Sequence, residues 1–138
     1  MKWWRNPPSG GQEIRNLLAI INRELRDDDS ALSLDGRFIH AFWASLCVAR
    51  AALRASGYRL RSTAHHYLAI ESLEYTLGLD AGQVHRLQAF RAKRARAEYE
   101  MTDVVTDTEH REARQLAEDL RQALVAWLRA EHPRLLPA

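Results

Sequence analysis

Apolar residues recur along this chain at the three- and four-residue spacing of one helix face, from about residue 14 to about residue 128. Short polar or glycine-containing segments separate the periodic stretches, and no alternating run is typical of a strand. The pattern therefore predicts an all-α fold, specifically an antiparallel up-and-down bundle of four to five helices.

Five helices are expected, and local signals mark several of their ends. They are expected over residues 14–25, 35–56 and 62–77, from 80 into a basic stretch, and from 106 onward, with the acidic run 27–29 in a turn. Ser33 is the expected N-cap of the second helix, and Thr106 with Glu109 has the spacing of a capping box. Gly57 and Gly78 are expected to end helices, because glycine adopts the left-handed cap conformation at little cost.

The composition fits one globular domain. The 138 residues are 46% apolar, enough for a single packed core. We expect residues 1–11 to form a flexible N-terminal arm, 12–132 a single helical domain and 133–138 a C-terminal tail. The single cysteine, Cys47, excludes an intrachain disulfide and is expected in the core. No apolar run resembles a signal peptide or a membrane span, so a cytoplasmic protein without membrane contact is expected.

The kind of basic residue says more than the net charge of +2. The chain has 18 arginines and 2 lysines, and arginine suits phosphate or carboxylate binding, although the codon usage of a GC-rich genome also explains the excess. Basic residues concentrate in the stretch AFRAKRARAEYE, residues 89–100. One interpretation is a phosphate-binding surface with Tyr99 beside it. The other is a solvated face on which Glu98 and Glu100 pair locally, and composition alone favours it.

The sequence as a whole resembles HEPN-domain proteins. The similarity runs through LSLDGRF, AFWASLCVARAALRASGYR, HHYLAIESLEYTLGL, LQAFRAKRARAEYE and EDLRQALVAWL, roughly residues 30–132. It is greatest to a small bacterial branch whose fourth helix reads FRxKRNxxxY. The resemblance implies an up-and-down bundle that pairs into a homodimer. Many relatives are ribonucleases or toxins, in which an arginine and a histidine of two subunits meet at the dimer interface.

The motif of that family maps onto the basic stretch residue by residue. Arg94 matches the motif arginine, Ala95 stands where a polar residue such as Asn is usual, and Tyr99 stands where catalytic members have His. Free tyrosine has a pKa near 10 and is a poor base at neutral pH. Under the resemblance, Arg94 and Tyr99 are the candidate catalytic residues. The candidate nucleic-acid-binding residues are Arg91, Lys93, Arg94 and Arg96.

Three hypotheses about function follow. The first is a dimeric module that binds RNA or nucleotide phosphate through the basic helix without efficient catalysis. The second is a metal-independent, toxin-like ribonuclease in which Tyr99 replaces the histidine. The third is a structural or regulatory dimer of a toxin–antitoxin or defence system, with Arg94 in an ion pair with Glu98 or with an acidic residue of another helix. The partners implied are a second copy, RNA or a nucleotide, and a nucleotidyltransferase-type or antitoxin protein.

Other chemistry has weaker support. Arginine–histidine pairs at the family's spacing also occur among Arg59, Arg61, His65 and His66. Three such pairs are seen where chance gives ~2, so they carry little information. The histidines lack metal-ligand spacing, and no nucleophile elbow, phosphate loop or dinucleotide fingerprint is present. Neither a metal nor a cofactor is expected.

Overall fold

The computed structural model describes residues 3–5, 11–26, 33–60, 66–99 and 103–136. Within these ranges the chain is an all-α bundle of five helices with one short antiparallel strand pair, which confirms the predicted fold class. The elements are, in order, β1 (Trp3–Arg5), α1 (Gln12–Arg26), α2 (Leu34–Ala55), β2 (Tyr58–Leu60), α3 (His66–Thr76), α4 (Ala81–Tyr99), α5 (Asp107–Glu131) and a 3₁₀ turn, η1 (Pro133–Leu135).

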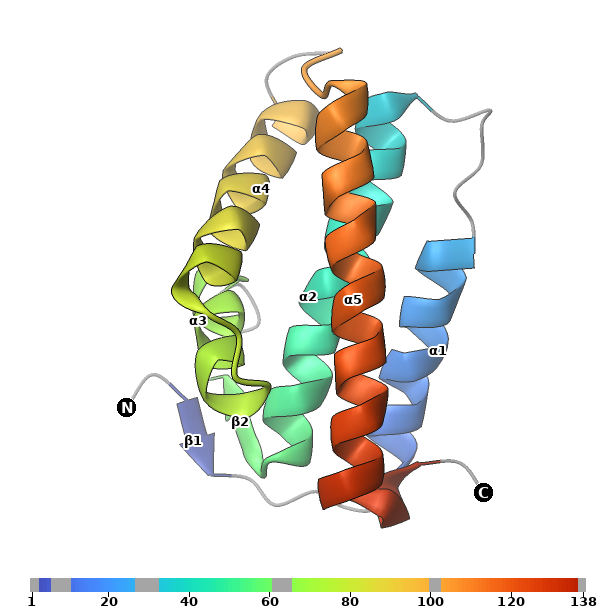
Figure 1. Ribbon diagram of the computed structural model, residues 1–138, viewed down its shortest axis with the longest axis vertical. Helices are drawn as coiled ribbons and strands as arrows, with labels where there is room; N and C mark the ends of the chain where they lie inside the picture. The colour runs from blue at the N-terminus through green and yellow to red at the C-terminus, as the bar shows by residue number, and fades with distance from the viewer. Residues whose placement is uncertain (1–2, 6–10, 27–32, 61–65, 100–102, 137–138) are drawn as a thin grey trace.

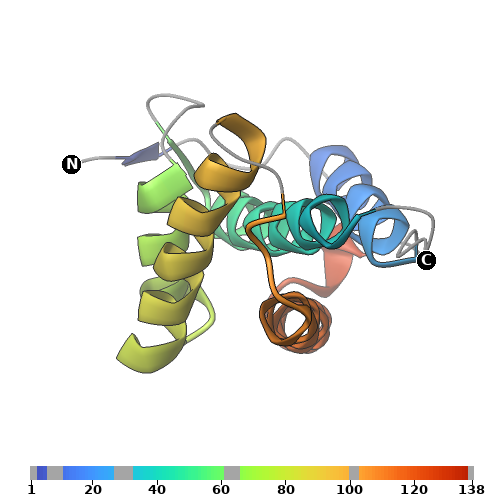
Figure 2. The ribbon, with the colours of Figure 1, turned by 90° about the horizontal axis from the view of Figure 1, so that it is seen from above.

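The four longest helices alternate in direction. In Figure 1, α1 rises, α2 descends, α4 rises and α5 descends, while the shorter α3 lies beside α4. Viewed from above, α2 occupies the centre, with α3 and α4 on one side of it and α1 on the other, as Figure 2 shows. Helix α2 packs against all four other helices, so it is the axis around which the domain is built.

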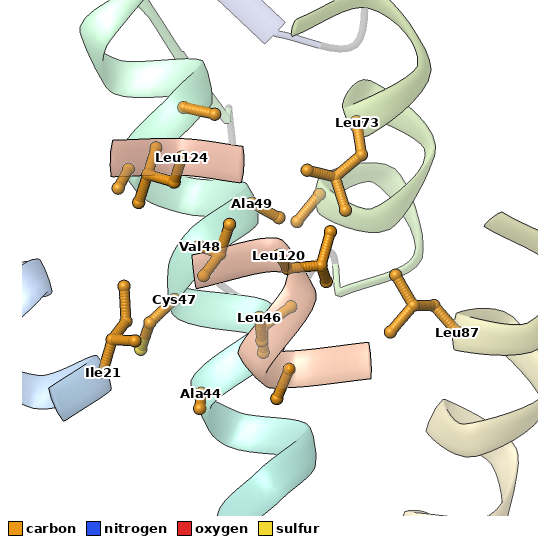
Figure 3. Close-up of a cluster of buried hydrophobic side chains, with 14 of the residues drawn as sticks. Ile21, Ala44, Leu46, Cys47, Val48, Ala49, Leu73, Leu87, Leu120 and Leu124 are labelled. Atoms are coloured by element: carbon orange, nitrogen blue, oxygen red, sulfur yellow. The ribbon is translucent and has the colours of Figure 1, made fainter. Parts of the chain in front are cut away.

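The position of α2 explains its composition. Alanines such as Ala44, Ala49 and Ala52 are completely buried along it, and such small side chains let neighbouring helices approach closely. Larger buried side chains fill the space between helices: Figure 3 shows Leu46 of α2 near Leu120 of α5. The apolar spacing of the first two expected helices does mark their buried faces, which contain Ile14, Leu17, Leu18, Ile21, Leu25, Phe38, Phe42, Ala49 and Leu53.

The predicted helix ends are also confirmed where the structure describes them. The Ser33 side chain accepts a hydrogen bond from the backbone N–H of Gly36 at 3.1 Å. Thr106 and Glu109 form the reciprocal capping box at the start of α5. Gly57 and Gly78 have φ values of 89° and 71°, the left-handed conformation expected after a helix. The acidic run 27–29 lies outside the described residues.

One expectation about secondary structure was wrong. The sequence predicted no strand, yet Trp3–Arg5 pairs antiparallel with Tyr58–Leu60. Strands of three residues are too short to show alternation in the sequence. The third helix is described from His66 onward, and its expected start near residue 62 lies outside the described residues. At the other end of the chain, η1 places Leu135 in the core with 1% exposure. No helix in the described ranges is long and apolar enough to cross a membrane.

Candidate functional site

The basic stretch forms the C-terminal half of α4 (Ala81–Tyr99). Asp80 precedes the helix: its carboxylate accepts from the Gln83 N–H at 2.8 Å, and its own N–H donates to the Gln83 side chain at 3.2 Å. Val84, Leu87 and Phe90 are the buried residues of this helix. All three precede the basic residues, so α4 is anchored through its first half. The charged residues that follow Phe90 are partly or fully exposed.

The four basic residues predicted as a binding set point in different directions. Successive residues are turned by about 100° around a helix axis, and the contacts follow this rotation. Lys93 pairs with Glu109 of α5, with the Lys93 ammonium 3.3 Å from a carboxylate oxygen. Arg91 instead lies over the ring of Tyr67 of α3, and Arg96 is exposed. The structure therefore places Arg91 beside α3 and turns Lys93 toward α5.

Arg94 is partly enclosed. Its guanidinium lies 3.2 Å from the carboxylate of Glu98, one turn further along α4, and each side chain is about a fifth exposed (22% and 23%). Pairing between these two residues was one of the alternatives left open by the sequence. Glu98 neutralises part of the charge that Arg94 presents.

Tyr99 is separated from Arg94 around the helix. It is the last residue of α4 and is 79% exposed. Five residues correspond to a rotation of about 140°, so the two side chains leave the helix in different directions. The structure thus does not unite the two candidate catalytic residues on one face.

A histidine does lie near Arg94, and it comes from another helix. His66 is the first residue of α3, which packs beside α4. Its pKa is lowered, first because the ring is partly buried, and then because the positive charges of Arg94, Arg50 and Arg91 act on it. The Glu98 carboxylate opposes this effect. His66 is therefore surrounded by more positive than negative charge.

Tyr67 completes this surface. The Arg91 guanidinium carbon lies 5.6 Å from the centre of its ring. Gln88 connects the two helices here, because its amide donates to the Tyr67 carbonyl at 3.0 Å while its side-chain oxygen accepts from Arg91 at 2.9 Å. The Tyr67 hydroxyl is hydrogen-bonded to Glu71, which, together with the charge of that carboxylate, raises the pKa of Tyr67.

We call this surface the Arg94 patch. It consists of Arg50, His66, Tyr67, Arg91 and Arg94, drawn from α2, α3 and α4. Sequence reasoning found two of these residues, Arg91 and Arg94. It weighed His66 only at short sequence spacings to Arg59 and Arg61, and Arg61 lies outside the described residues. The signal for His66 is the packing of α3 on α4, which residue spacing along the chain does not reveal.

Other clusters of ionisable groups connect helices. The buried Glu24 of α1 binds His40 of α2 and its neighbour Arg23. Partial burial alone would raise the pKa of Glu24, but these two partners lower it overall. Glu13 of α1 accepts hydrogen bonds from Arg54 and Arg59, each at 2.9 Å. These networks join α1 to α2 and to β2.

Two surface grooves lie elsewhere. One of about 430 Å³ runs between the end of α1 and α5, and the other, of about 540 Å³, lies between the start of α4 and α5. Neither includes a residue of the Arg94 patch. Among the described residues, no three His, Cys, Asp or Glu side chains are grouped so that they could hold a metal ion.

No protein-family model matches the chain, and no curated protein matches it.

Proposed function

We propose that this protein binds RNA through phosphate contacts made by the Arg94 patch. The observation that carries the proposal is that Arg91 and Arg94 lie on α4 where it packs beside α3, with Arg91 over the ring of Tyr67 at 5.6 Å, and that the charges of both arginines and of Arg50 act on His66. Guanidinium groups bind phosphate oxygens through paired N–H donors. The resemblance of residues 30–132 to HEPN-domain proteins adds support, because Arg94 matches their motif arginine.

The shape of the patch supports a polymer as the ligand in preference to a free nucleotide. Small-molecule sites are usually concave and enclose most of the ligand. Here Arg50 and Tyr67 are exposed. A group of exposed and partly exposed arginines suits a strand that carries one phosphate per nucleotide. The net charge of +2 does not oppose the approach of such a strand.

A purely structural role for Arg94 has less support. The Arg94–Glu98 pair lies within one helix and is partly exposed. Pairs of this kind stabilise a helix by about 0.2–0.5 kcal/mol. That is too little to explain Arg94 by stability alone, whereas removing one partner of a buried pair between helices would cost about 3–5 kcal/mol. We therefore expect Arg94→Ala to change the melting temperature little.

The proposal is tested with a labelled pool of short RNAs and fluorescence anisotropy at low and at moderate salt. We expect wild-type protein to bind and Arg94→Ala to bind about tenfold more weakly, because one charged hydrogen-bond partner is lost. The slope of log affinity against log salt should fall by about 0.7 for each phosphate contact removed from a single strand.

Arg111→Ala is the matched control. Arg111 is an exposed arginine that also pairs with a carboxylate four residues away, Asp107, but it lies on α5. Its loss should leave RNA affinity as in wild type. Equal binding by the Arg94 and Arg111 variants would show that binding is nonspecific, and no binding by wild-type protein would overturn the proposal.

A second candidate function is metal-independent RNA cleavage, and the proximity of His66 to Arg94 favours it. Because its pKa is lowered, the His66 ring is neutral at pH 7 and can accept a proton. It would take the proton of a ribose 2′-hydroxyl as that oxygen bonds to the adjacent phosphorus. The bond to the 5′-oxygen then breaks, solvent protonates this oxygen, and a 2′,3′-cyclic phosphate remains. Arg94 would stabilise the negative charge that develops on the non-bridging phosphoryl oxygens.

Cleavage is assayed with the same RNA pool in the presence of a chelator. The second candidate predicts cyclic-phosphate products that disappear in His66→Ala and in Arg94→Ala. Tyr99→Phe should retain cleavage, since Tyr99 leaves α4 in another direction. If cleavage were lost in Tyr99→Phe and retained in His66→Ala, the proton transfer would be assigned to Tyr99 instead of His66. Binding without cleavage would leave the first proposal standing.

The same proposal includes the assembly implied by the resemblance, which is a homodimer with a nucleotidyltransferase-type or antitoxin partner. It also includes residence in the cytoplasm, which was expected from the lack of an apolar run typical of a signal peptide.

A further inference from the structure

The Arg94 patch contains an aromatic ring that phosphate binding does not require. Tyr67 is 47% exposed, although it lies in the first turn of α3 beside partly buried neighbours. Exposed tyrosines also occur at Tyr75 and Tyr99. Tyr67 differs from both because it lies directly against a basic residue of the patch, Arg91.

The orientation of the Tyr67 ring is set by contacts on several sides. Arg91 lies over the ring, and Arg91 is itself held by Gln88. Gln88 also binds the Tyr67 backbone carbonyl, and Glu71 binds the hydroxyl. A ring held in this way loses little conformational freedom when a ligand stacks on it, which lowers the entropic cost of binding.

This arrangement fits an unpaired base. Every base has a flat π face, and stacking on an aromatic side chain stabilises a single strand on its protein largely without regard to sequence. Bases in a duplex are already stacked on one another and do not offer this face. A guanidinium on one side of the ring also strengthens such a stack through the cation–π interaction.

We infer that the Arg94 patch is specific for single-stranded RNA, with one base stacked on the area of the Tyr67 ring that Arg91 leaves uncovered and adjacent phosphates bound by Arg91 and Arg94. This inference rests on the proposed function and names the strand state of the RNA. It assigns Tyr67 to base contact and the arginines to the backbone. Selectivity between bases is expected to be weak, because stacking has little dependence on base identity.

The test compares one labelled RNA oligonucleotide as a single strand and as a duplex with its complement, for wild-type protein and for Tyr67→Ala, Tyr67→Phe and Tyr75→Ala. Tyr67→Ala should weaken single-strand binding by about 5- to 100-fold and change duplex binding by less than about twofold. Tyr67→Phe keeps the ring and should bind as wild type does. Tyr75→Ala is the matched control, since Tyr75 is an exposed tyrosine about 12 Å further along the same helix.

The outcomes distinguish the inference, base stacking on Tyr67, from the proposed function, RNA binding by the Arg94 patch. If wild type binds neither form of RNA, the proposed function fails and the inference fails with it. If binding depends on Arg94 but Tyr67→Ala matches Tyr75→Ala, or if duplex binds as tightly as single strand, phosphate binding stands and the stacking inference is overturned. Melting curves check each variant. Should Tyr67→Ala unfold, Tyr67→Leu replaces it, because leucine keeps apolar bulk without a π face; wild-type-like single-strand affinity in Tyr67→Leu would equally overturn the inference.

Discussion

At the scale of single residues, His66 links the Arg94 patch to pH. Its pKa lies below the ordinary value of 6.5, through burial and the neighbouring arginines. In the pH range between the two values the unfolded chain binds a proton at this site and the folded chain does not. The free energy of unfolding therefore rises with pH across this range. The stability that neutral His66 contributes is present above pH 6.5 and is lost as pH falls toward the folded pKa.

Replacing His66 by glutamine removes this dependence. Urea denaturation from about pH 7.5 to about pH 5 should show a shallower loss of stability on acidification in His66→Gln than in wild type. His85→Gln, at an exposed position of α4, is the matched control for losing a histidine. The carboxyls Glu13, Glu24 and Glu109 have lowered pKa values too and cost stability at lower pH in every variant. Equal slopes for all three proteins would contradict the assignment to His66.

Cys47 gives a second prediction at this scale. Its side chain is completely buried in α2, and burial raises the pKa of the thiol to about 11. Only the thiolate reacts with disulfide reagents or maleimides. In the native protein at neutral pH, labelling should thus be slow and should accelerate in urea in step with unfolding. Rapid labelling without denaturant would show that the middle of α2 opens locally.

Only part of the Arg94 patch could be predicted from the pattern of residues along the sequence. Arg91 and Arg94 were found because they crowd into one short stretch. His66 and Tyr67 belong to another helix, and their position beside the arginines of α4 depends on the register at which α3 packs against α4. A single sequence contains no direct signal for that register. Helix geometry alone predicts that Lys93 and Arg94 point in different directions. Which of these two side chains points toward α3 depends on how α3 packs against α4.

At the scale of elements, the start of α5 also fixes its relation to α4. Glu109 accepts a hydrogen bond from the Thr106 backbone N–H at 3.0 Å and pairs with Lys93. Its partial burial alone would raise its pKa, but the bonds from Thr106 and Lys93 lower the pKa overall. One carboxylate thus completes the cap of α5 and connects it to the helix that carries the Arg94 patch.

Removing the cap should therefore destabilise the domain measurably. Thr106→Ala deletes the oxygen that accepts from the Glu109 N–H at 3.1 Å, and loss of an N-cap costs about 0.5–2 kcal/mol. Thr106→Ser keeps a hydroxyl and should cost little by comparison. Urea denaturation with an unchanged m-value measures both. Equal stability of the Ala and Ser variants would mean that Thr106 does not cap α5 in solution.

The elements differ in how well the sequence predicted them, and the reason is physical. Helices α1, α2 and α5 are long and amphipathic or apolar, and the N-caps of α2 and α5 have local signatures, so these three helices were predicted closely. The pair of β1 and β2 depends on contact between residues about 55 apart in sequence, and three residues per strand carry no periodic signal. The packing of Leu135 beneath the bundle is likewise a long-range contact.

At the scale of the whole molecule, the helix that organises the core and the surface that carries the proposed function are different. Helix α2 lies at the centre with small buried side chains (Figure 2), while four of the five residues of the Arg94 patch come from α3 and α4. The patch depends on the bundle through Phe90, which packs edge-on against Phe38 of α2 with ring centres 5.5 Å apart. Substitutions that loosen this contact should reduce stability and RNA binding together.

The homodimer implied by the resemblance is the prediction that concerns the whole molecule, and mass action tests it. If folding is coupled to association, the urea midpoint rises with protein concentration, whereas the midpoint of a monomer does not. Sedimentation velocity gives the mass of the species directly. A dimer also presents two Arg94 patches, so an RNA strand long enough to reach both should bind more tightly than a short one, because the second contact occurs at a high effective concentration. A constant midpoint and monomer mass would exclude the dimer. In that case the gain in affinity with strand length should be absent as well, since a single patch is saturated by a short strand.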